Sequence, residues 1–446
     1  LVKEMFGDPK GVYSRLNKCL LCGSCVVNCP SGINSLEIFI KARVILTGYM
    51  GLSGIKKIIL RFVLGRPVFF NRIMGFVSGY QRYFSRPVDK YIGTSCARFG
   101  IPLFKDRHFK SLASVPFHDR IPSVDKPSGS SNIKVAFFVG CIIDKVFPEI
   151  AESALKIFEY HGIGVFMPEG EGCCGIPAIS SGDTKTFNSL VLHNIERFDA
   201  GKFDYLITAC ATCTYTIKKI WPMMFQAESD ETKEKIIKLS EKTLDINQFL
   251  VSEVGLVKEN ETMDDDPISI TYHDPCHLKK SMGVFTEPRE LIEANNRYRL
   301  KEMREADRCC GMGGSFNLSH YDISSEIGKR KRDNIAASNC SIVATGCPAC
   351  MIHISDMLSK SGDKVLIKHT IESNIQKIKS YLKINLSAPV GATRRLKILI
   401  TPGRDSAFSP LCALPGAPSF FEITSNKQVT MMAKLRRHQV FDILNI

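Results

Sequence analysis

The sequence predicts an α/β protein in which a mostly helical N-terminal domain precedes two α/β lobes related by a pseudo-twofold. A set of five cysteines occurs twice, and equivalent cysteines of the two sets lie 135, 136 and 137 residues apart. Each opening cysteine and each closing Cys-x-x-Cys follows a β-like apolar run, and amphipathic helical stretches lie between them. A separate dense cysteine run near the N-terminus marks a domain of another kind.

The repeat predicts two metal sites at the ends of parallel strands. Open parallel sheets bind ligands beyond the carboxyl ends of their strands, where these cysteines fall. Thiolates suit iron–sulfur clusters and zinc alike, but structural zinc takes four ligands in a tetrahedron, so a fifth cysteine favours a multi-iron cluster. The first set comprises Cys141, Cys173, Cys174, Cys210 and Cys213. The second set comprises Cys276, Cys309, Cys310, Cys347 and Cys350.

Length and composition indicate an ordinary globular chain of two to three domains. The 446 residues are 44% hydrophobic and 23% charged, with neither a secretory signal nor an apolar run of transmembrane length. Seventeen cysteines could form disulfides in a secreted protein, but their spacing is that of metal ligands. We therefore expect the protein in the reducing cytoplasm, either free or bound peripherally to the inner face of the membrane.

The N-terminal run has the spacing Cys-x2-Cys-x2-Cys-x3-Cys-Pro of bacterial ferredoxins and favours iron–sulfur over a zinc knuckle. In such runs three cysteines hold one cubane and the fourth commonly ligates another cluster. Either Cys29 or Cys96 could be the fourth ligand of the cubane here, and Cys96 could equally be an ordinary buried thiol. The sequence shows one such run, and a partner run would lie upstream of Leu1. The run consists of Cys19, Cys22, Cys25 and Cys29.

Two motifs resemble a known family. His273-Asp-Pro-Cys276-His277 and Glu171-Gly-Cys173-Cys174-Gly175 are similar to the cysteine-rich CCG domain of heterodisulfide reductase catalytic subunits and of the iron–sulfur subunits of glycolate, lactate and glycerol-3-phosphate oxidoreductases. The resemblance covers roughly residues 134–385. It implies two Rossmann-like lobes after a ferredoxin-like domain, with a 4Fe–4S cluster, cubane or noncubane, at one or both five-cysteine sets. Zinc at one of the sets stays open.

Within these sets the adjacent pairs are the candidates for chemistry, since neighbouring thiolates on one turn can place a sulfur between two irons. The candidate catalytic residues are Cys173, Cys174, Cys309 and Cys310. His273 and His277 flank Cys276, and either could hydrogen-bond a cluster sulfur or move a proton near pH 7, or could merely fill the end of the strand.

Residues 41–120 are strongly basic. They contain 15 Lys and Arg, three Asp and no Glu, a net charge of +12 against +14 for the chain, with 13 interleaved aromatic residues. They could form a helical linker, or a docking face for an acidic partner subunit or an anionic membrane surface. No recognition module accompanies the charge, so nucleic acid is not expected as a partner. Residues 53–65 are predicted to form a basic amphipathic helix.

These features divide the chain into five segments. We expect a ferredoxin-like domain at 1–40, a basic aromatic-rich helical connector and linker at 41–133, cysteine-rich lobes at 134–260 and 261–385, and an irregular tail at 386–446. The linker into the first lobe is the Pro/Ser/Gly-rich stretch 121–133. Cys412 in the tail is expected to be a stray thiol.

Three functions compete at this point. The first is an iron–sulfur electron-transfer subunit that relays electrons from a flavoprotein oxidising a 2-hydroxy acid, of the glycolate or lactate type, towards quinone or another carrier. The second is a heterodisulfide-reductase-like catalytic subunit that cleaves a disulfide at a noncubane cluster. The third, a zinc-stabilised scaffold without activity, is disfavoured by the ferredoxin run. No flavin-binding motif is present, so an oxidase activity requires a partner chain.

Overall fold

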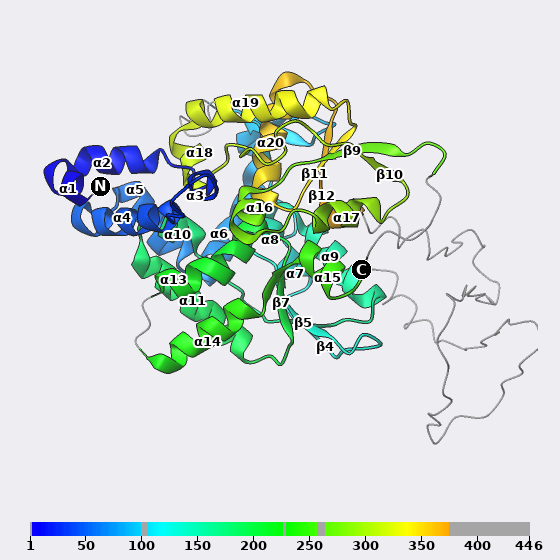
Figure 1. The fold of residues 1–446 in the computed structure, drawn as a ribbon, viewed down its shortest axis with the longest axis horizontal. Helices are drawn as coiled ribbons and strands as arrows, with labels where there is room; N and C mark the ends of the chain where they lie inside the picture. Colours follow the sequence, from blue (N-terminus) through cyan, green and yellow to red (C-terminus); the bar gives the residue numbers. More distant parts are fainter. Residues whose placement is uncertain (1, 100–105, 226–228, 257–263, 374–446) are drawn as a thin grey trace, which may run out of the picture. The chain divides into compact units, whose positions relative to one another are not determined.

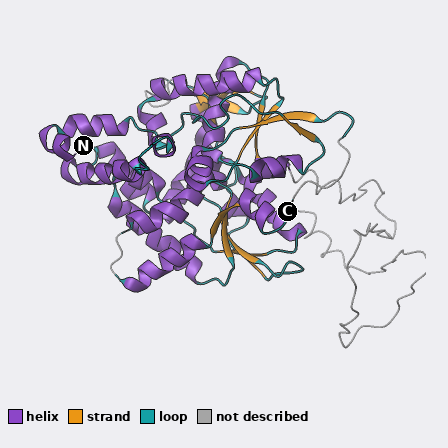
Figure 2. Cartoon of the chain, viewed as in Figure 1, coloured by secondary structure: helices purple, strands orange, loops and turns teal. Residues whose placement is uncertain are grey.

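The computed structural model describes residues 2–99, 106–225, 229–256 and 264–373. Contacts group residues 1–382 into one compact unit and 383–446 into another. The first unit mixes helices with parallel sheets, so the predicted α/β class is confirmed (Figure 1, Figure 2). The expected irregular tail and Cys412 lie outside the described residues.

The N-terminal part is helical. Asp8 caps the second helix by accepting a hydrogen bond from Gly11 N at 2.8 Å, and Asn34 caps the fourth by accepting from Glu37 N at 3.3 Å. Val12, Leu16, Ala42 and Leu46 bury their side chains together, which packs the second helix on the fourth. The cysteine run lies between these two helices. The helices are α1 (Val2–Gly7), α2 (Pro9–Asn17), α3 (Ser24–Val27) and α4 (Ser35–Met50).

The connector starts as helix and continues as sheet. The helix predicted at 53–65 is confirmed, as α5 (Gly54–Lys57) runs into the π-helix η1 (Ile58–Leu64). The prediction of a helical connector was wrong for 85–97 and 109–110, because Pro87 cannot continue a helix and Gly93, with φ at +76°, reverses the chain. The remaining elements are α6 (Pro67–Phe84), an antiparallel sheet of β1 (Ser85–Asp89), β2 (Thr94–Ala97) and β3 (Phe109–Lys110), and α7 (Phe117–Arg120).

The first five-cysteine set belongs to a sheet with strand order β4-β6-β5-β7-β8. All pairings are parallel except that of the edge strand β4, which lies in the predicted linker and pairs antiparallel with β6. The strands are β4 (Val124–Lys126), β5 (Lys134–Phe138), β6 (Gly164–Met167), β7 (Tyr205–Thr208) and β8 (Thr243–Asp245). The helices are α8 (Cys141–Val146), α9 (Pro148–Tyr160), α10 (Ile176–Ser180), α11 (Thr184–Asp199), α12 (Ala211–Tyr215), η3 (Thr216–Ile220), α13 (Trp221–Met224), α14 (Asp230–Glu241) and α15 (Ile246–Ser252).

The second set belongs to a separate parallel sheet with order β10-β9-β11-β12. Taken in chain order, its strands follow the same arrangement as β5 to β8 of the first sheet. The strands are β9 (Ile268–Tyr272), β10 (Tyr298–Leu300), β11 (Ile342–Thr345) and β12 (Leu366–His369). The helices are α16 (Cys276–Met282), α17 (Glu287–Glu293), α18 (Ser315–Ser319), α19 (Tyr321–Ala337) and α20 (Pro348–Ser361).

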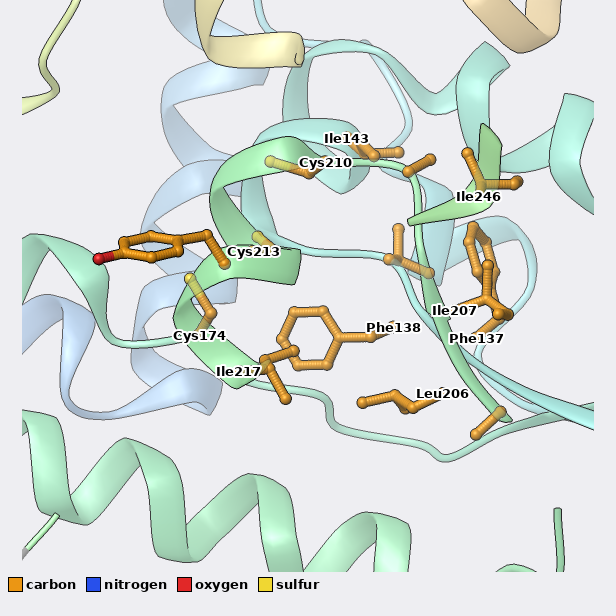
Figure 3. Packing of buried hydrophobic residues seen from close by; sticks show 14 of the residues in the cluster. Phe137, Phe138, Ile143, Cys174, Leu206, Ile207, Cys210, Cys213, Ile217 and Ile246 are labelled. Atoms are coloured by element: carbon orange, nitrogen blue, oxygen red, sulfur yellow. The ribbon is translucent and has the colours of Figure 1, made fainter. Parts of the chain in front are cut away.

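The core of the first sheet reaches the cysteines directly. Phe137 and Phe138 of β5 are fully buried, and Phe138 lies beside Leu206, Ile217 and the helix that carries Cys213 (Figure 3). The rigid apolar packing therefore continues from the strands to the thiols at their ends.

Candidate metal centre

Four cysteines stand where a parallel strand passes into a helix. Cys141 and Cys276 begin α8 and α16, and Cys210 and Cys347 precede the first residues of α12 and α20. In a βα unit this position brings side chains from neighbouring strands to one edge of the sheet.

The first set forms one cluster of free thiols. The Sγ atoms of Cys141 and Cys173 are 3.9 Å apart, and thiol hydrogen bonds continue through Cys174 and Cys213 to Cys210. Of the five, only Cys141 is not fully buried. Hydrogen bonds from Cys173 and Cys213 lower the pKa of Cys174, so the negative charge is favoured on the second cysteine of the pair.

Two glycines let the backbone approach this cluster. Gly140 has φ at +79°, and a Cβ there would lie 3.2 Å from Cys213 Sγ. Gly175, with φ at +91°, would place a Cβ 2.9 Å from the Phe187 ring. Asn194 Nδ2 donates to Cys173 O at 3.0 Å, and Trp221 Nε1 donates to Cys174 O at 2.8 Å, which fixes the backbone of the pair.

The second set repeats this arrangement. Cys276 contacts Cys309, and thiol hydrogen bonds join Cys309, Cys310, Cys350 and Cys347 in turn. Hydrogen bonds from Cys309 and Cys350 lower the pKa of Cys310, as happens at Cys174.

His273 completes a possible metal-binding group. A ring nitrogen of His273 and the sulfurs of Cys310 and Cys350 all lie within 4.8 Å of one another. Its Nδ1 donates to Ala306 O at 3.2 Å, and Nε2 is buried without a hydrogen-bond partner among the described residues. Burial lowers the pKa of His273 to about 3, so the imidazole is neutral and keeps a free lone pair.

The two sets meet at one point. The thiol of Cys210 hydrogen-bonds that of Cys347, which joins the closing pairs of the first and second sets. Ala211 N donates to Gly346 O at 3.1 Å beside this contact, and Thr212 Oγ1 is 3.6 Å from Cys347 Sγ. An unbroken path of sulfur contacts therefore runs from Cys141 through both sets to Cys276.

The N-terminal run extends this path. Cys22 hydrogen-bonds the thiol of Cys309, and this contact raises the pKa of Cys22 above its usual range. His277 Nε2 donates to Leu21 O at 3.0 Å, which leaves Nδ1 to accept from Thr212 Oγ1 at 3.3 Å. Lys280 Nζ donates to Ser24 Oγ at 2.7 Å. Helix α16 therefore holds the N-terminal run against the second set, and His277 joins the run to both sets.

The other cysteines of the run stand apart from this contact. Cys19 is half-buried and accepts a hydrogen bond from Leu21 N at 3.4 Å, and burial raises its pKa. Cys25 is exposed, and Cys29 Sγ accepts from Ile33 N at 3.4 Å. Cys96, the alternative fourth ligand, lies in β2, where its sulfur accepts a hydrogen bond from Arg86 Nε at 3.3 Å.

Sequence reasoning missed an acidic and basic group beside the first set. The half-buried Glu171 accepts hydrogen bonds from Val139 N at 2.9 Å and Gly140 N at 2.6 Å, and desolvation raises its pKa to about 7. Burial lowers the pKa of His118, but its hydrogen bond to Asp144 and the charges of Glu171 and Asp144 together outweigh burial and raise the pKa. Glu171 stands in the Glu-Gly-Cys-Cys motif, which could have signalled it, whereas His118 lies in no recognisable motif.

These groups line a small cavity with Cys141 and Cys173. The cavity holds about 10 Å³, room for about one water molecule, and Leu64, Pro67 and Phe70 of the connector close its other side. The connector therefore covers the first set, while the N-terminal run covers the second.

Comparisons with known proteins agree with this geometry. The family model of the CCG cysteine-rich domain matches residues 135–218 and 270–355. An uncharacterized iron–sulfur protein of Methanococcus maripaludis is 36% identical over 231 residues, which cover 52% of this chain and 43% of the relative. A subunit of the fumarate reductase (CoM/CoB) of Methanothermobacter marburgensis is 32% identical over 282 residues, 62% of this chain and 53% of the relative.

A third relative matches over a longer part. The probable glycolate oxidase iron–sulfur subunit of Bacillus subtilis is 25% identical over 378 residues, 80% of this chain and 81% of the relative. The chain spans about half the length of the relatives to which its sequence identity exceeds 30%.

Proposed function

Since the chain carries two CCG cysteine-rich domains, we propose that it is the iron–sulfur electron-transfer subunit of an oxidoreductase complex. It relays electrons from a flavoprotein partner, which oxidises a 2-hydroxy acid of the glycolate or lactate type, towards quinone or another carrier. The observation that carries this proposal is the continuous path of sulfur contacts from Cys22, through Cys309 and the Cys347–Cys210 contact, to Cys141. Enzymatic activity belongs to the complex, and the chain by itself is expected to be inactive.

The donor chemistry fits iron–sulfur clusters. All 16 cysteines of the described residues are free thiols, and each five-cysteine set is gathered within thiol contact at the end of a sheet. We assign a cubane to Cys19, Cys22 and Cys25, with Cys29 as the fourth cysteine of the run, and a 4Fe–4S cluster, cubane or noncubane, to each set. When bound, such clusters supply one-electron transfer. Five contacting sulfurs in each set exceed what a tetrahedral zinc site uses, so zinc at one set is the less favoured occupant.

The surroundings of the two sets differ, which gives the relay a direction. The second set contacts the N-terminal run through Cys309, whereas the first set ends beside Glu171 and His118. We propose the order N-terminal run, second set, first set. Burial lowers the pKa values of His273 and His277, so both imidazoles are neutral. Neither histidine therefore places a positive charge between the N-terminal run and the two sets.

A heterodisulfide-reductase-like activity, which cleaves a disulfide at a noncubane cluster, is the second candidate, since the two five-cysteine sets resemble that family as well. Cleavage requires a substrate sulfur to reach one of the adjacent pairs, Cys173-Cys174 or Cys309-Cys310. The cavity beside Cys173 admits about one water molecule, far less than a thiol coenzyme disulfide needs, unless the connector moves away. The closed geometry therefore favours the relay.

The proposal includes the organisation of the chain into domains. The shared strand order of the two sheets supports lobes related by a pseudo-twofold, with a ferredoxin-like domain before them. The proposed segments are 1–40, 41–133, 134–260, 261–385 and 386–446. The basic segment 41–120 is the proposed contact for the redox partner or a membrane surface, which gives a peripheral position on its inner face.

The test is metal and sulfide analysis of the anaerobically purified full chain. Iron and acid-labile sulfide without zinc are expected. Cys174→Ala and Cys310→Ala should each lose the iron of one site, because each removes the thiol whose negative charge its set favours. Cys340→Ala is the matched control, since Cys340 is a buried free thiol outside both sets and should keep all the iron. A single zinc at each set would overturn the proposal.

A further inference from the structure

Helix α6 turns most of its large apolar residues outward. Its inward side includes polar residues: Ser78 Oγ donates to Ala113 O at 2.5 Å, and Gln81 exchanges hydrogen bonds of 2.9 Å with the backbone of Leu112. At helical periodicity its outward half carries the apolar residues. These are Val68, Phe69, Phe76, Val77, Tyr80, Tyr83 and Phe84, whose side chains are 42% to 66% exposed.

The preceding turns continue this surface. Ile55, Ile58, Ile59 and Phe62 of α5 and η1 are between 48% and 75% exposed. Residues 54–84 thus contain 11 of the 27 large apolar side chains that are exposed in the part of the chain that the structure describes. An exposed apolar surface of this density, on helices that bury only Leu60 and Ser78, is typical of a contact with something other than water.

Basic residues rim the same surface. Residues 54–84 contain six Lys and Arg and no Asp or Glu. Arg61 pairs with the buried Asp183 at 3.2 Å and so fixes η1 to the first lobe. The other five make no ion pair with the described residues, and two of them, Arg66 and Arg82, lie over the exposed rings of Phe62 and Tyr83. The five are Lys56, Lys57, Arg66, Arg72 and Arg82.

We propose that α5, η1 and α6 dock the protein on an anionic lipid surface, with the helices lying in the plane of the interface. Aromatic and aliphatic side chains on one face of a helix with unpaired Lys and Arg beside them are the signature of such interfacial helices. Tyr80 and Tyr83 lie near the C-terminal end of α6. Tyrosine is enriched at the headgroup level of membranes, where its ring contacts apolar chains and its hydroxyl contacts water.

The charge of residues 54–84 favours an anionic lipid surface over a protein partner. Five unpaired cations rim the apolar face and residues 54–84 contain no Asp or Glu, which matches the negative charge of an anionic lipid surface. No single helix in the described ranges has the length and apolarity to cross a membrane; α4 with α5–η1 reaches them only as a pair bent by 109°.

Docking at this surface also places the first set near the membrane. The inward residues Leu64, Pro67 and Phe70 of the same segment line the cavity beside Cys141 and Cys173. In the proposed relay the last cysteine set would then face the side from which a membrane quinone arrives. This placement rests on the proposed function, whereas the docking itself does not.

The test is co-sedimentation of the full chain with vesicles of phosphatidylcholine alone and of equal parts phosphatidylcholine and phosphatidylglycerol. Binding is expected only to the anionic vesicles. The triple variant Phe69→Ser, Phe76→Ser, Tyr80→Ser should lower the partition coefficient by at least about a hundredfold. The control, Leu192→Ser, Ile237→Ser, Leu318→Ser, removes exposed apolar residues elsewhere and should bind as the parent does.

A second pair of variants tests the charge. Lys56→Gln, Lys57→Gln, Arg66→Gln should lower binding about a hundredfold, since each basic residue near an anionic surface contributes about fivefold. The control, Lys202→Gln, Lys301→Gln, Lys364→Gln, changes exposed lysines elsewhere and should leave binding unchanged. Absence of binding to anionic vesicles, or equal losses in test and control variants, overturns the proposal in favour of a protein occupant. Iron content and EPR signals of the same preparations report on the relay independently.

Discussion

Replacing Asp245 by Asn should stabilise the folded protein at neutral pH. Asp245 is fully buried where β8 ends, and its Oδ1 accepts hydrogen bonds from the backbone N of Asn247 at 2.9 Å and from Asn247 Nδ2 at 2.7 Å. Its Oδ2 has no partner among the described residues, and burial raises the pKa of Asp245 from 3.8 to about 7. Asn247 in turn accepts a hydrogen bond from Thr370 beyond the second sheet, so this network joins the two lobes near their cysteines.

The sign follows from the two pKa values of Asp245. As pH rises, the unfolded chain releases the proton near pH 3.8, while the folded protein keeps it until about pH 7. The free energy of unfolding therefore falls between these values by about 1.4 kcal/mol per pH unit, a total of about 4 kcal/mol above pH 7. Asn keeps the accepting Oδ1 but buries an unpaired NH₂, which costs about 1–3 kcal/mol. The net gain for Asp245→Asn at pH 8 is about 1–3 kcal/mol.

The assay is urea unfolding of the anaerobic protein followed by circular dichroism at pH 5 and pH 8. Relative to Asp245→Asn, the parent should lose about 3 kcal/mol between these pH values, because Asp245 titrates in the folded state within this range. Asp265→Asn, a change at an exposed carboxylate, should follow the parent. If Asp245→Asn and the parent have parallel pH dependence, burial does not govern this carboxyl and the argument fails.

Three further outcomes are expected. Gly175→Ala should destabilise the first lobe by about 2 kcal/mol or more in thermal unfolding, because Gly175 has a φ of +91° and a Cβ there would lie 2.9 Å from the Phe187 ring. The control Gly48→Ala changes a helical glycine with open space around it and should be neutral or stabilising. Equal effects of the two substitutions would refute the backbone argument. Cys25→Ser should remove the cubane EPR signal and the broadening that it causes in the others, whereas Cys22→Ser should also shift the signal of the second set that it touches; identical spectra would contradict the contact with Cys309. Binding of an acidic redox partner through 41–120 should weaken as salt rises and the Debye length falls from about 10 Å to about 3 Å, and salt-independent assembly would refute this electrostatic part.

The sequence predicted the parts of this molecule that local patterns control. Strand runs before Cys141, Cys210, Cys276 and Cys347 became β5, β7, β9 and β11, because a β-like run that ends at a helix start is a local signal. The basic helix at 53–65 followed from periodicity in the same way. The sheet β1–β3 was missed because its strands are short and their pairing depends on the turn at Gly93.

The contacts between sites could not be predicted, because they are long-range. Cys22 and Cys309 are separated by most of the chain, and no spacing rule relates them. The Cys210–Cys347 contact depends on how two separate sheets pack, which the repeat alone does not specify. The exposed aromatics of 41–120 were recognised as a group, but only the structure shows that α6 turns Ser78 and Gln81 inward.

The most direct test of the relay is a reductive titration of the anaerobic full chain followed by EPR. Because Cys22 contacts Cys309 and Cys210 contacts Cys347, the reduced centres should lie close enough to broaden one another's signals, and the spectra should contain more than one cluster type. Cys25→Ser should remove one signal and sharpen the remainder. A single uncoupled cluster signal, with no iron at either five-cysteine set, would contradict the account.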